Sequence, residues 1–257
     1  MLILSFDTTN EHGGAGIYRD TESLATIANP GGTNYSISLF DMVDHLLAET
    51  GLRLKDIELF AAANGPGSFT GIRVGLAAAQ GWAKALGRQA RGVSILEALV
   101  EAVGSDADLV LPLLDARRSE FYLCPFRRVG DARATEGGDL PGPASPFPFR
   151  ADGGGLALKR ADLEPFMRQL AAGKERSGGA PPSVCCVTRQ QDCAAESLRG
   201  FLSGPLEWKV VAGTLVGAIA RRARQAHQEA SGGEPESACG LDAYYIRRSD
   251  AELHWKE

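Results

Sequence analysis

Hydrophobic residues in the first part of the chain alternate between strand and helix periods. Apolar runs at 2–6 and 57–63 predict buried strands, and residues 14–18 predict another strand after a polar turn. Residues 37–50 and 72–86 carry apolar side chains every three or four positions, which predicts two helices. The resulting order of strand, strand, helix, strand and helix is typical of a layered α/β fold.

The same pattern restarts near residue 108, after a short strand and a helix predicted at 89–103. In both places a hydrophobic strand ends at an aspartate, and a second strand follows a polar turn. Asp7 and Arg19 are twelve positions apart, as are Asp115 and Arg127. Two such openings predict a duplicated α/β architecture. Chance similarity between two hairpins is the alternative.

The expected domains are therefore 1–107 and 108–257. The first contains the two helices to which we assign dimerisation below. The last long helix of the second either stays in its own domain or packs on the first. Segments rich in Gly, Pro, Ala and Ser predict irregular connections. They lie at 129–155, 174–183 and 229–240. Three further helices are predicted at about 160–172, 193–203 and 213–228, followed by a short strand-like DAYYIRR.

Composition narrows the classes of function. The net charge of -5 and the pI near 5.5 argue against an extended nucleic-acid-binding surface. The first apolar run is too short for a signal peptide or a membrane span, so we expect a cytoplasmic protein with no membrane contact. Five cysteines without a CxxC pair indicate a reduced interior, and Cys185 and Cys186 in SVCCV are interpreted as buried thiols of a strand.

The turn after the first strand contains Asp7, Thr8 and Thr9. A strand, an aspartate and a hydroxyl-rich turn also open ATPases of the actin and sugar-kinase type, where the carboxylate faces hydrated Mg²⁺. Glu11 would repel a phosphate, and Asp115 in the second opening has no hydroxyl neighbours. These four residues, Asp7, Thr8, Thr9 and Asp115, are therefore a vestigial nucleotide site, or each aspartate only fixes its own turn.

The segment NGPGSFTG at 64–71 opens directly into a predicted helix. It lacks the lysine of a Walker loop and the spacing of a Rossmann loop. Gly65, Gly67 and Gly71 are expected to allow positive φ, and Thr70 is the expected N-cap. Phe69 is expected to insert into a neighbouring pocket or a partner. The loop is an architectural element in this interpretation; its members are Gly65, Pro66, Gly67, Ser68, Phe69, Thr70 and Gly71.

The helix after this loop is apolar in nearly every direction, so it must be covered on more than the side that meets a sheet. Gly75 and Gly81 would let a second helix approach closely. The helix at 37–50 also has more apolar residues than one stripe requires, including Ile37, Phe40 and Met42. We therefore expect a helical protein–protein interface. The alternative is that the helix at 37–50 covers this face within the chain. The expected interface residues are Leu39, Phe40, Val43, Leu47, Phe69, Ile72, Arg73, Gly75, Leu76, Ala79 and Trp82.

The segment GPGSFTGIR at 65–73 resembles the signature of the TsaB (YeaZ) family. Similar segments are LSFDTTNE near the N-terminus, LLDARRSEFY at 113–122 and YYIRRSDAE at 244–252. A His-Ser pair that is common in the family before the first helix is replaced by Asn34, Tyr35 and Ser36.

The resemblance implies two duplicated domains of the actin/Hsp70/sugar-kinase (ASKHA) type. It implies an accessory subunit that dimerises with a TsaD-type catalytic subunit for N6-threonylcarbamoylation of adenosine 37 in ANN-decoding tRNAs. It further implies a TsaE-type ATPase as partner, tRNA contact only through the complex, a homodimer when alone, and no cofactor of its own, with ATP or ADP allowed at the complex interface.

Other chemistry finds little support in the sequence. The four histidines have no HxxxH spacing, so no metal site is expected, and no GxSxG elbow is present. No catalytic residue is therefore expected in this chain. Arginines that could touch tRNA phosphates in an assembly, or simply form a solvated face, lie at 221, 222, 224, 247 and 248. The rival hypothesis is a stand-alone ASKHA-fold ATPase or kinase that uses the Asp7 turn.

Overall fold

The computed structural model describes residues 1–29, 31, 34–129, 147–172, 182–190, 206–230 and 241–246. The chain divides into two compact units. The first comprises Met1–Ala98 together with the described residues from Gly213 onward, and the second is Leu99–Ala212. The expected boundary at 107 follows the restart of the sequence pattern, whereas this division follows packing and assigns the last long helix to the first unit.

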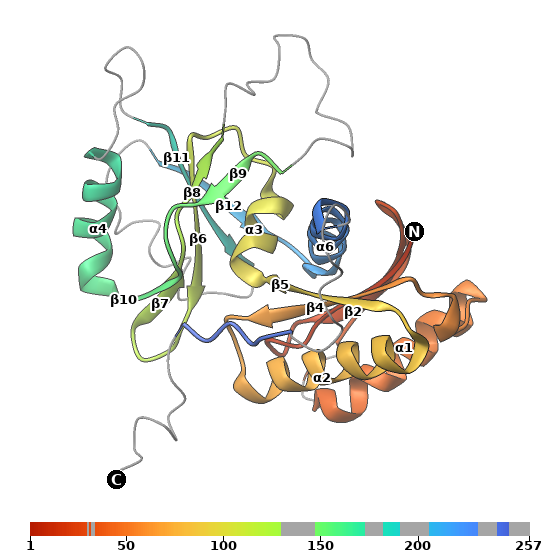
Figure 1. Ribbon diagram of the computed structural model, residues 1–257. Helices are drawn as coiled ribbons and strands as arrows, with labels where there is room; N and C mark the ends of the chain where they lie inside the picture. Colours follow the sequence, from red (N-terminus) through yellow and green to blue (C-terminus); the bar gives the residue numbers. More distant parts are fainter. Residues whose placement is uncertain are drawn as a thin grey trace. The chain divides into compact units, whose positions relative to one another are not determined.

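The first unit contains a five-stranded mixed sheet (Figure 1). Its order is β3 (Glu22–Ala28), β2 (Gly14–Arg19), β1 (Leu2–Asp7), β4 (Leu59–Gly65) and β5 (Gln89–Ser94). Strands β1, β2 and β3 are antiparallel neighbours, and β1, β4 and β5 are parallel. Strand β3 was not predicted, because it is an edge strand whose alternation is interrupted by exposed polar residues.

Helices cover both faces of this sheet (Figure 1). Helices α1 (Tyr35–Thr50) and α2 (Phe69–Leu86) lie on one face, and α6 (Val216–Ala230) lies on the other. A 3₁₀ turn, η1 (Leu54–Asp56), precedes β4, and α3 (Ile95–Val103) follows β5. The predicted helices at 37–50 and 72–86 are confirmed, each beginning two or three residues earlier than expected.

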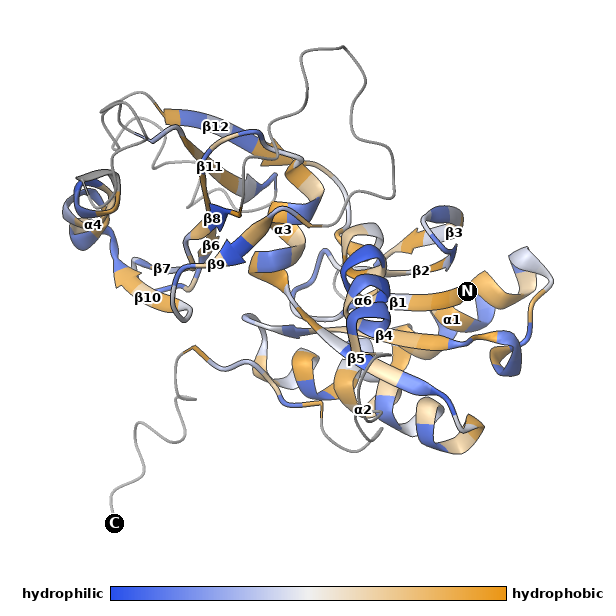
Figure 2. Ribbon diagram, turned by 45° about the horizontal axis from the view of Figure 1, so that its top comes forward, coloured by the Kyte–Doolittle hydropathy of each residue, from blue (hydrophilic) through white to orange (hydrophobic). Residues whose placement is uncertain are grey.

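The alternation of β1 explains why both faces are covered. Leu4 and Phe6 are buried in the core beneath α1 and α2. Ser5 points to the opposite face, where its hydroxyl donates to the Val216 carbonyl at the start of α6 (2.8 Å). Successive side chains of a strand point to opposite faces, so a strand covered on both sides is apolar almost throughout. Figure 2 shows this as hydrophobic residues along β1 and β4.

The second unit repeats the topology. Its main strand order is β10 (Leu156–Lys159), β7 (Glu120–Leu123), β6 (Leu109–Asp115), β11 (Val184–Arg189) and β12 (Leu206–Val211). The first three are antiparallel neighbours and the last three are parallel, as in the first unit. The predicted duplication and the ASKHA-type α/β fold are thereby confirmed. Helix α4 (Arg160–Ala172) packs against this sheet through Leu163 and Met167.

Some predicted elements differ from the structure or lie outside its described residues. Strand β9 (Phe149–Ala151), which pairs with β8 (Phe126–Arg128), lies within the segment expected to be irregular. The described part of DAYYIRR, residues 242–246, forms no strand, although Tyr244 N–H donates to the Asn64 carbonyl (2.7 Å). The helix predicted at 193–203 lies outside the described residues. None of the described helices is long and apolar enough to cross a membrane.

Cys185 and Cys186 are fully buried on β11, as predicted. Burial raises the pKa of both thiols, that of Cys186 to about 12. The thiolate is the reactive form, and on the order of 10⁻⁴ of a thiol with that pKa is ionised at pH 8.

We expect neither Cys185 nor Cys186 to be labelled by a disulfide reagent at pH 8 until the second unit unfolds. Peptide mapping of the labelled protein with and without guanidinium measures this. Labelling of either cysteine within minutes in native buffer, at a rate that rises with pH as for a free thiol, would contradict the packing of β11.

Candidate interaction site on the first two helices

The glycine-rich loop joins the end of β4 to the start of α2. Ser68 is the N-cap of α2, and its hydroxyl accepts from the Gly71 N–H (3.2 Å). The prediction of Thr70 as the N-cap is therefore wrong. The helix begins at Phe69, and Thr70 lies exposed in its first turn. Ser68 takes the role because it is the last residue with extended backbone before the helix, and serine is as good a cap as threonine.

The glycines of the loop allow close approach between two backbone segments more than they supply a left-handed backbone conformation. Of the three loop glycines, Gly65 alone has positive φ, at 120°, so the expectation of positive φ at Gly67 and Gly71 is wrong. A Cβ at Gly67 would lie 2.5 Å from the Thr9 carbonyl oxygen. A Cβ at Gly71 would lie 1.9 Å from the Thr8 carbonyl oxygen. Such distances exclude any side chain, so the loop lies directly against the turn that follows β1.

Hydrogen bonds within this contact use the polar groups of the turn. The Asp7 carboxylate accepts from the Thr9 N–H (2.8 Å) and the Thr9 hydroxyl (2.6 Å). The Thr8 hydroxyl donates to the Gly71 carbonyl (2.7 Å), and Ser68 N–H donates to the Thr9 carbonyl (2.7 Å). Asp7, Thr8 and Thr9 are at most 2% exposed. The side chains that would face a phosphate are therefore engaged inside the protein.

Asp115 makes the equivalent bond in the second unit. Its carboxylate accepts from the Arg117 N–H, two residues further on (2.7 Å). Both aspartates thus do what the turn-fixing alternative expects, because a short acidic side chain stabilises a turn by accepting from the backbone. The two sequence openings share this hydrogen bond as well as their topology.

Six of the eleven expected interface residues are not on the surface. They face the sheet or the Asp7 turn within the first unit: Leu39, Val43, Ile72, Gly75, Leu76 and Ala79. The expectation that Gly75 admits a second helix is also wrong, because its Cβ would lie 2.4 Å from the Thr8 hydroxyl oxygen. Periodicity identified the apolar residues of these helices, but it did not tell which of them meet the sheet.

The remaining apolar surface of α1 and α2 forms a groove of about 370 Å³. Phe40 is 47% exposed, and its ring meets that of Trp82 edge-on, 5.6 Å apart. Ile37, one turn before Phe40, is 70% exposed, the highest value among the exposed large hydrophobic residues of the described chain. The groove is lined by Ser36, Phe40, Val74, Ala77, Ala78, Gly81 and Trp82.

Sequence reasoning missed Val74 and Ala77 as surface residues. The sequence pattern that could have identified them is the spacing of Val74, Ala77 and Gly81. These residues recur every three or four positions, on the side of α2 opposite Ile72 and Ala79. These three side chains are small, so the groove floor is low, and Phe40 and Trp82 form one wall.

Phe69, expected to insert into a pocket or a partner, is packed within the chain. Its ring lies 5.1 Å from that of Tyr245, and the Arg73 guanidinium lies 3.7 Å above its centre. Arg73 Nε also donates to the Tyr245 hydroxyl (3.2 Å). The segment 241–246 thus covers the loop side of α2. Arg73 itself stays exposed beside this cluster, at the end of α2 that carries the loop.

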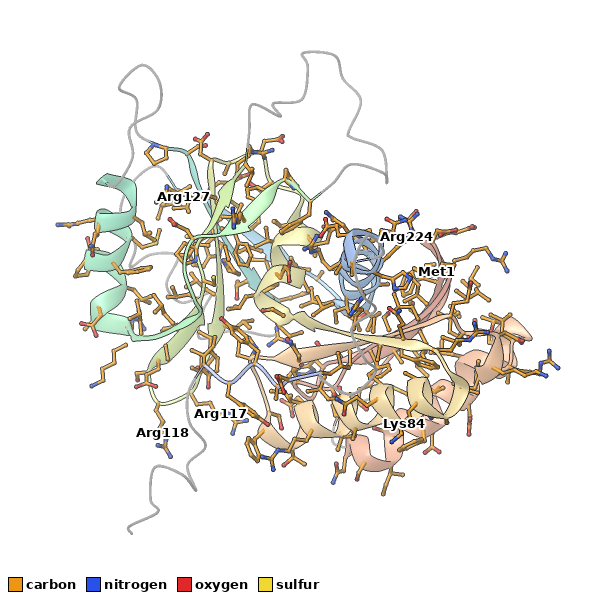
Figure 3. All side chains as sticks on the ribbon, viewed as in Figure 1. Met1, Lys84, Arg117, Arg118, Arg127 and Arg224 are labelled. Carbon is orange, nitrogen blue, oxygen red and sulfur yellow. The ribbon has the colours of Figure 1, made fainter. Side chains whose placement is uncertain are left out.

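Two of the arginines considered for tRNA contact are paired with acidic side chains within the protein. Arg222 donates to Glu97 through Nε (3.0 Å), and Arg224 of α6, labelled in Figure 3, donates to Asp20 (3.3 Å). Arginines 247 and 248 lie outside the described residues. In the described part of the chain no three His, Cys, Asp or Glu side chains are grouped as a metal site would require.

The same substitution at two positions of α2 tests the geometry of the loop. Gly71→Ala places a methyl group against the Thr8 carbonyl, and we expect it to destabilise the protein by about 1–3 kcal/mol or more. Gly81→Ala meets open space on an exposed helical position. It is expected to stabilise the protein by up to ~1 kcal/mol. Urea unfolding measures both; equal effects of the two substitutions would contradict the close contact.

Comparisons with known proteins agree with this architecture. Residues 22–147 match the family model of TsaD, tRNA N6-adenosine threonylcarbamoyltransferase. A TsaB of Bacillus subtilis, a tRNA threonylcarbamoyladenosine biosynthesis protein, is 34% identical over 48% of this chain and 53% of its own length. An uncharacterized protein of Mycobacterium tuberculosis is 32% identical over 55% of this chain and 69% of its own length. The chain spans about half the length of the curated TsaB relative that it matches.

Two solved structures from Pseudomonas aeruginosa share the fold over nearly the whole chain. YeaZ has a TM-score of 0.65 and covers 95% of this chain and 99% of its own, at 20% identity. A protein described as similar to peptidase YeaZ has a TM-score of 0.67, at 20% identity, over 96% and 99% of the two chains. These likenesses show the fold, and the sequence matches, one of which covers 69% of the relative at 32% identity, show that the chain belongs to the TsaB (YeaZ) family.

Proposed function

We propose that this protein is a non-catalytic accessory subunit of the system that forms N6-threonylcarbamoyladenosine in tRNA. Its role is to dock a TsaD-type catalytic subunit through the groove between α1 and α2. The observation that carries the proposal is this groove and the apolar surface beside it, where α1, already packed on its sheet, still exposes Ile37 and Phe40. Exposed apolar surface of this kind marks an interaction site.

The family match supports a TsaD-type chain as the occupant. The segment that resembles TsaD, residues 22–147, contains both α1 and α2. A TsaD-type protein therefore has a counterpart of this pair of helices, and two related surfaces can pair face to face about a pseudo-twofold axis. The same geometry allows a homodimer of this chain, which is the competing occupant in the experiment below.

What we expect from the sequence about cofactor, further partners and compartment is also part of this proposal. The chain holds no cofactor of its own, with ATP or ADP admitted only where it meets its partner. A TsaE-type ATPase and tRNA join through the assembled complex, which works in the cytoplasm. The named relative supports the pathway, since it is a threonylcarbamoyladenosine biosynthesis protein.

Ala77→Arg tests the groove. Ala77 is exposed on α2, so arginine is compatible with the helix, but its side chain fills the groove floor. We expect affinity for the TsaD-type subunit to fall about 30-fold or more, equivalent to ~2 kcal/mol, with an unchanged melting temperature. Light scattering on a size-exclusion column and titration calorimetry measure this.

Val129→Arg is the matched control, because Val129 is 56% exposed on the second unit and receives the same charge. It should bind the partner as the unchanged chain does. Equal binding by the Ala77→Arg chain would exclude the groove as the docking surface. A homodimer that the partner does not displace would favour self-association as the function of this surface.

The rival function is that of a stand-alone ATPase or kinase that uses Asp7. Because the Asp7 carboxylate is occupied by Thr9, we expect Asp7→Ala to lower the free energy of unfolding by about 1–3 kcal/mol. We expect no Mg-dependent ATP hydrolysis by either chain. Hydrolysis by the unchanged protein that disappears in Asp7→Ala, with the fold intact, would favour the rival.

A further inference from the structure

We propose that the turn Asp7–Asn10 is a positioning element that sets the α1–α2 groove for its partner. This inference rests on the proposed function and adds residues to it that do not touch the groove. The turn is connected by hydrogen bonds to the first turn of both helices that line the groove. A change in the turn therefore moves the groove walls, although the turn itself is buried.

The connection to α2 is made by two hydrogen bonds and a close contact. The Thr8 hydroxyl donates to the Gly71 carbonyl, and Ser68 N–H donates to the Thr9 carbonyl (both 2.7 Å). Gly75, one turn further along α2, faces the Thr8 hydroxyl at a distance that admits no side chain. Val74, directly before Gly75, and Ala77, two residues after it, both line the groove.

The connection to α1 is made by Tyr35, the first residue of that helix. Its hydroxyl donates to the Asn10 carbonyl (2.8 Å), and its side chain is 7% exposed. Ser36, the next residue, lines the groove. The Asn10 side chain in turn lies within hydrogen-bond distance of the Asp7 carboxylate (3.4 Å). Asp7 therefore holds together the part of the turn that contacts α2 and the part that contacts α1.

Apolar packing alone would leave the relative position of the helices loosely defined. Burial of hydrophobic surface is not directional, whereas hydrogen bonds weaken steeply with a change of distance or angle. The beginnings of α1 and α2 are held by directional bonds to one turn, and further along the helices Phe40 and Trp82 meet through their rings. The turn thus fixes the end of the groove that ring packing does not.

Strand β1, which leads into the turn, provides a matched control. Ser5 is fully buried on β1, and its hydroxyl donates to a helix carbonyl, that of Val216, at 2.8 Å. This bond has the chemistry of the bond from Thr8 to Gly71, but it connects β1 to α6 on the opposite face of the sheet. Loss of either bond affects the stability of the same unit, and only loss of the Thr8 bond affects the groove.

The experiment compares Thr8→Val, Thr8→Ser, Tyr35→Phe and Ser5→Ala in the full chain. We expect Thr8→Val and Tyr35→Phe to weaken binding of the TsaD-type subunit about tenfold. Thr8→Ser keeps the hydroxyl, so it should bind as the unchanged chain does. Ser5→Ala should lower the melting temperature about as much as Thr8→Val does, and its affinity should stay within about twofold of that of the unchanged chain. Equal affinities for Thr8→Val and Ser5→Ala would overturn the inference.

Amide hydrogen exchange gives a readout that does not need the partner. Thr8→Val should raise exchange in residues 35–40 and 69–74, and Ser5→Ala should not. A chain that binds no TsaD-type subunit in any form refutes the proposed function. In that case the exchange rates alone decide the role of the turn, and unchanged exchange at both helix starts in Thr8→Val and Tyr35→Phe overturns it.

Discussion

The structure depends on one close contact, in which the backbone of α2 lies against the turn after β1. Gly67, Gly71 and Gly75 each face Thr8 or Thr9 at a distance that excludes a Cβ. This contact fixes where α2 begins and how it crosses the sheet. The polar groups of the turn take part in it, because the Thr8 hydroxyl donates to the Gly71 carbonyl and the Thr9 hydroxyl donates to the Asp7 carboxylate. Whatever α2 presents on its other side follows from this placement.

The all-round apolar character of α2 has three separate causes in the structure. Ile72, Leu76 and Ala79 face the sheet, and Gly71 and Gly75 face the turn. Val74, Ala77 and Gly81 face the groove. A sequence pattern reports only that a side of the helix is apolar. It does not distinguish burial in a core, contact with backbone and exposure to a partner, since all three favour small or hydrophobic residues.

The sequence predicted the parts of the fold that repeat a local period. The strands around Asp7 and Asp115, the helices α1 and α2, and the duplication follow from alternation, helical spacing and the repeat itself. Strand β3 was missed because exposed polar residues interrupt its alternation, and the place of α6 was left open because it depends on contacts distant in the sequence. The site was predicted at the level of two helices. To decide that Leu39 is buried and that its neighbour Phe40 is exposed required the position of the sheet.

The two units contain the same aspartate turn, but different residues follow it. Asp7 and Asp115 each accept from the backbone N–H two residues on. After Asp7 come two hydroxyl side chains that are buried under a glycine loop. After Asp115 come Ala116 and then Arg117 and Arg118, which are exposed with positive φ and extend from the turn between β6 and β7 (Figure 3). The shared bond forms the turn, and the residues after it differ in charge and in burial. The first turn is covered by the start of α2, which leaves an apolar groove on its far side, so the proposed surface for a partner lies in the first unit next to a turn whose hydrogen bond the second unit shares.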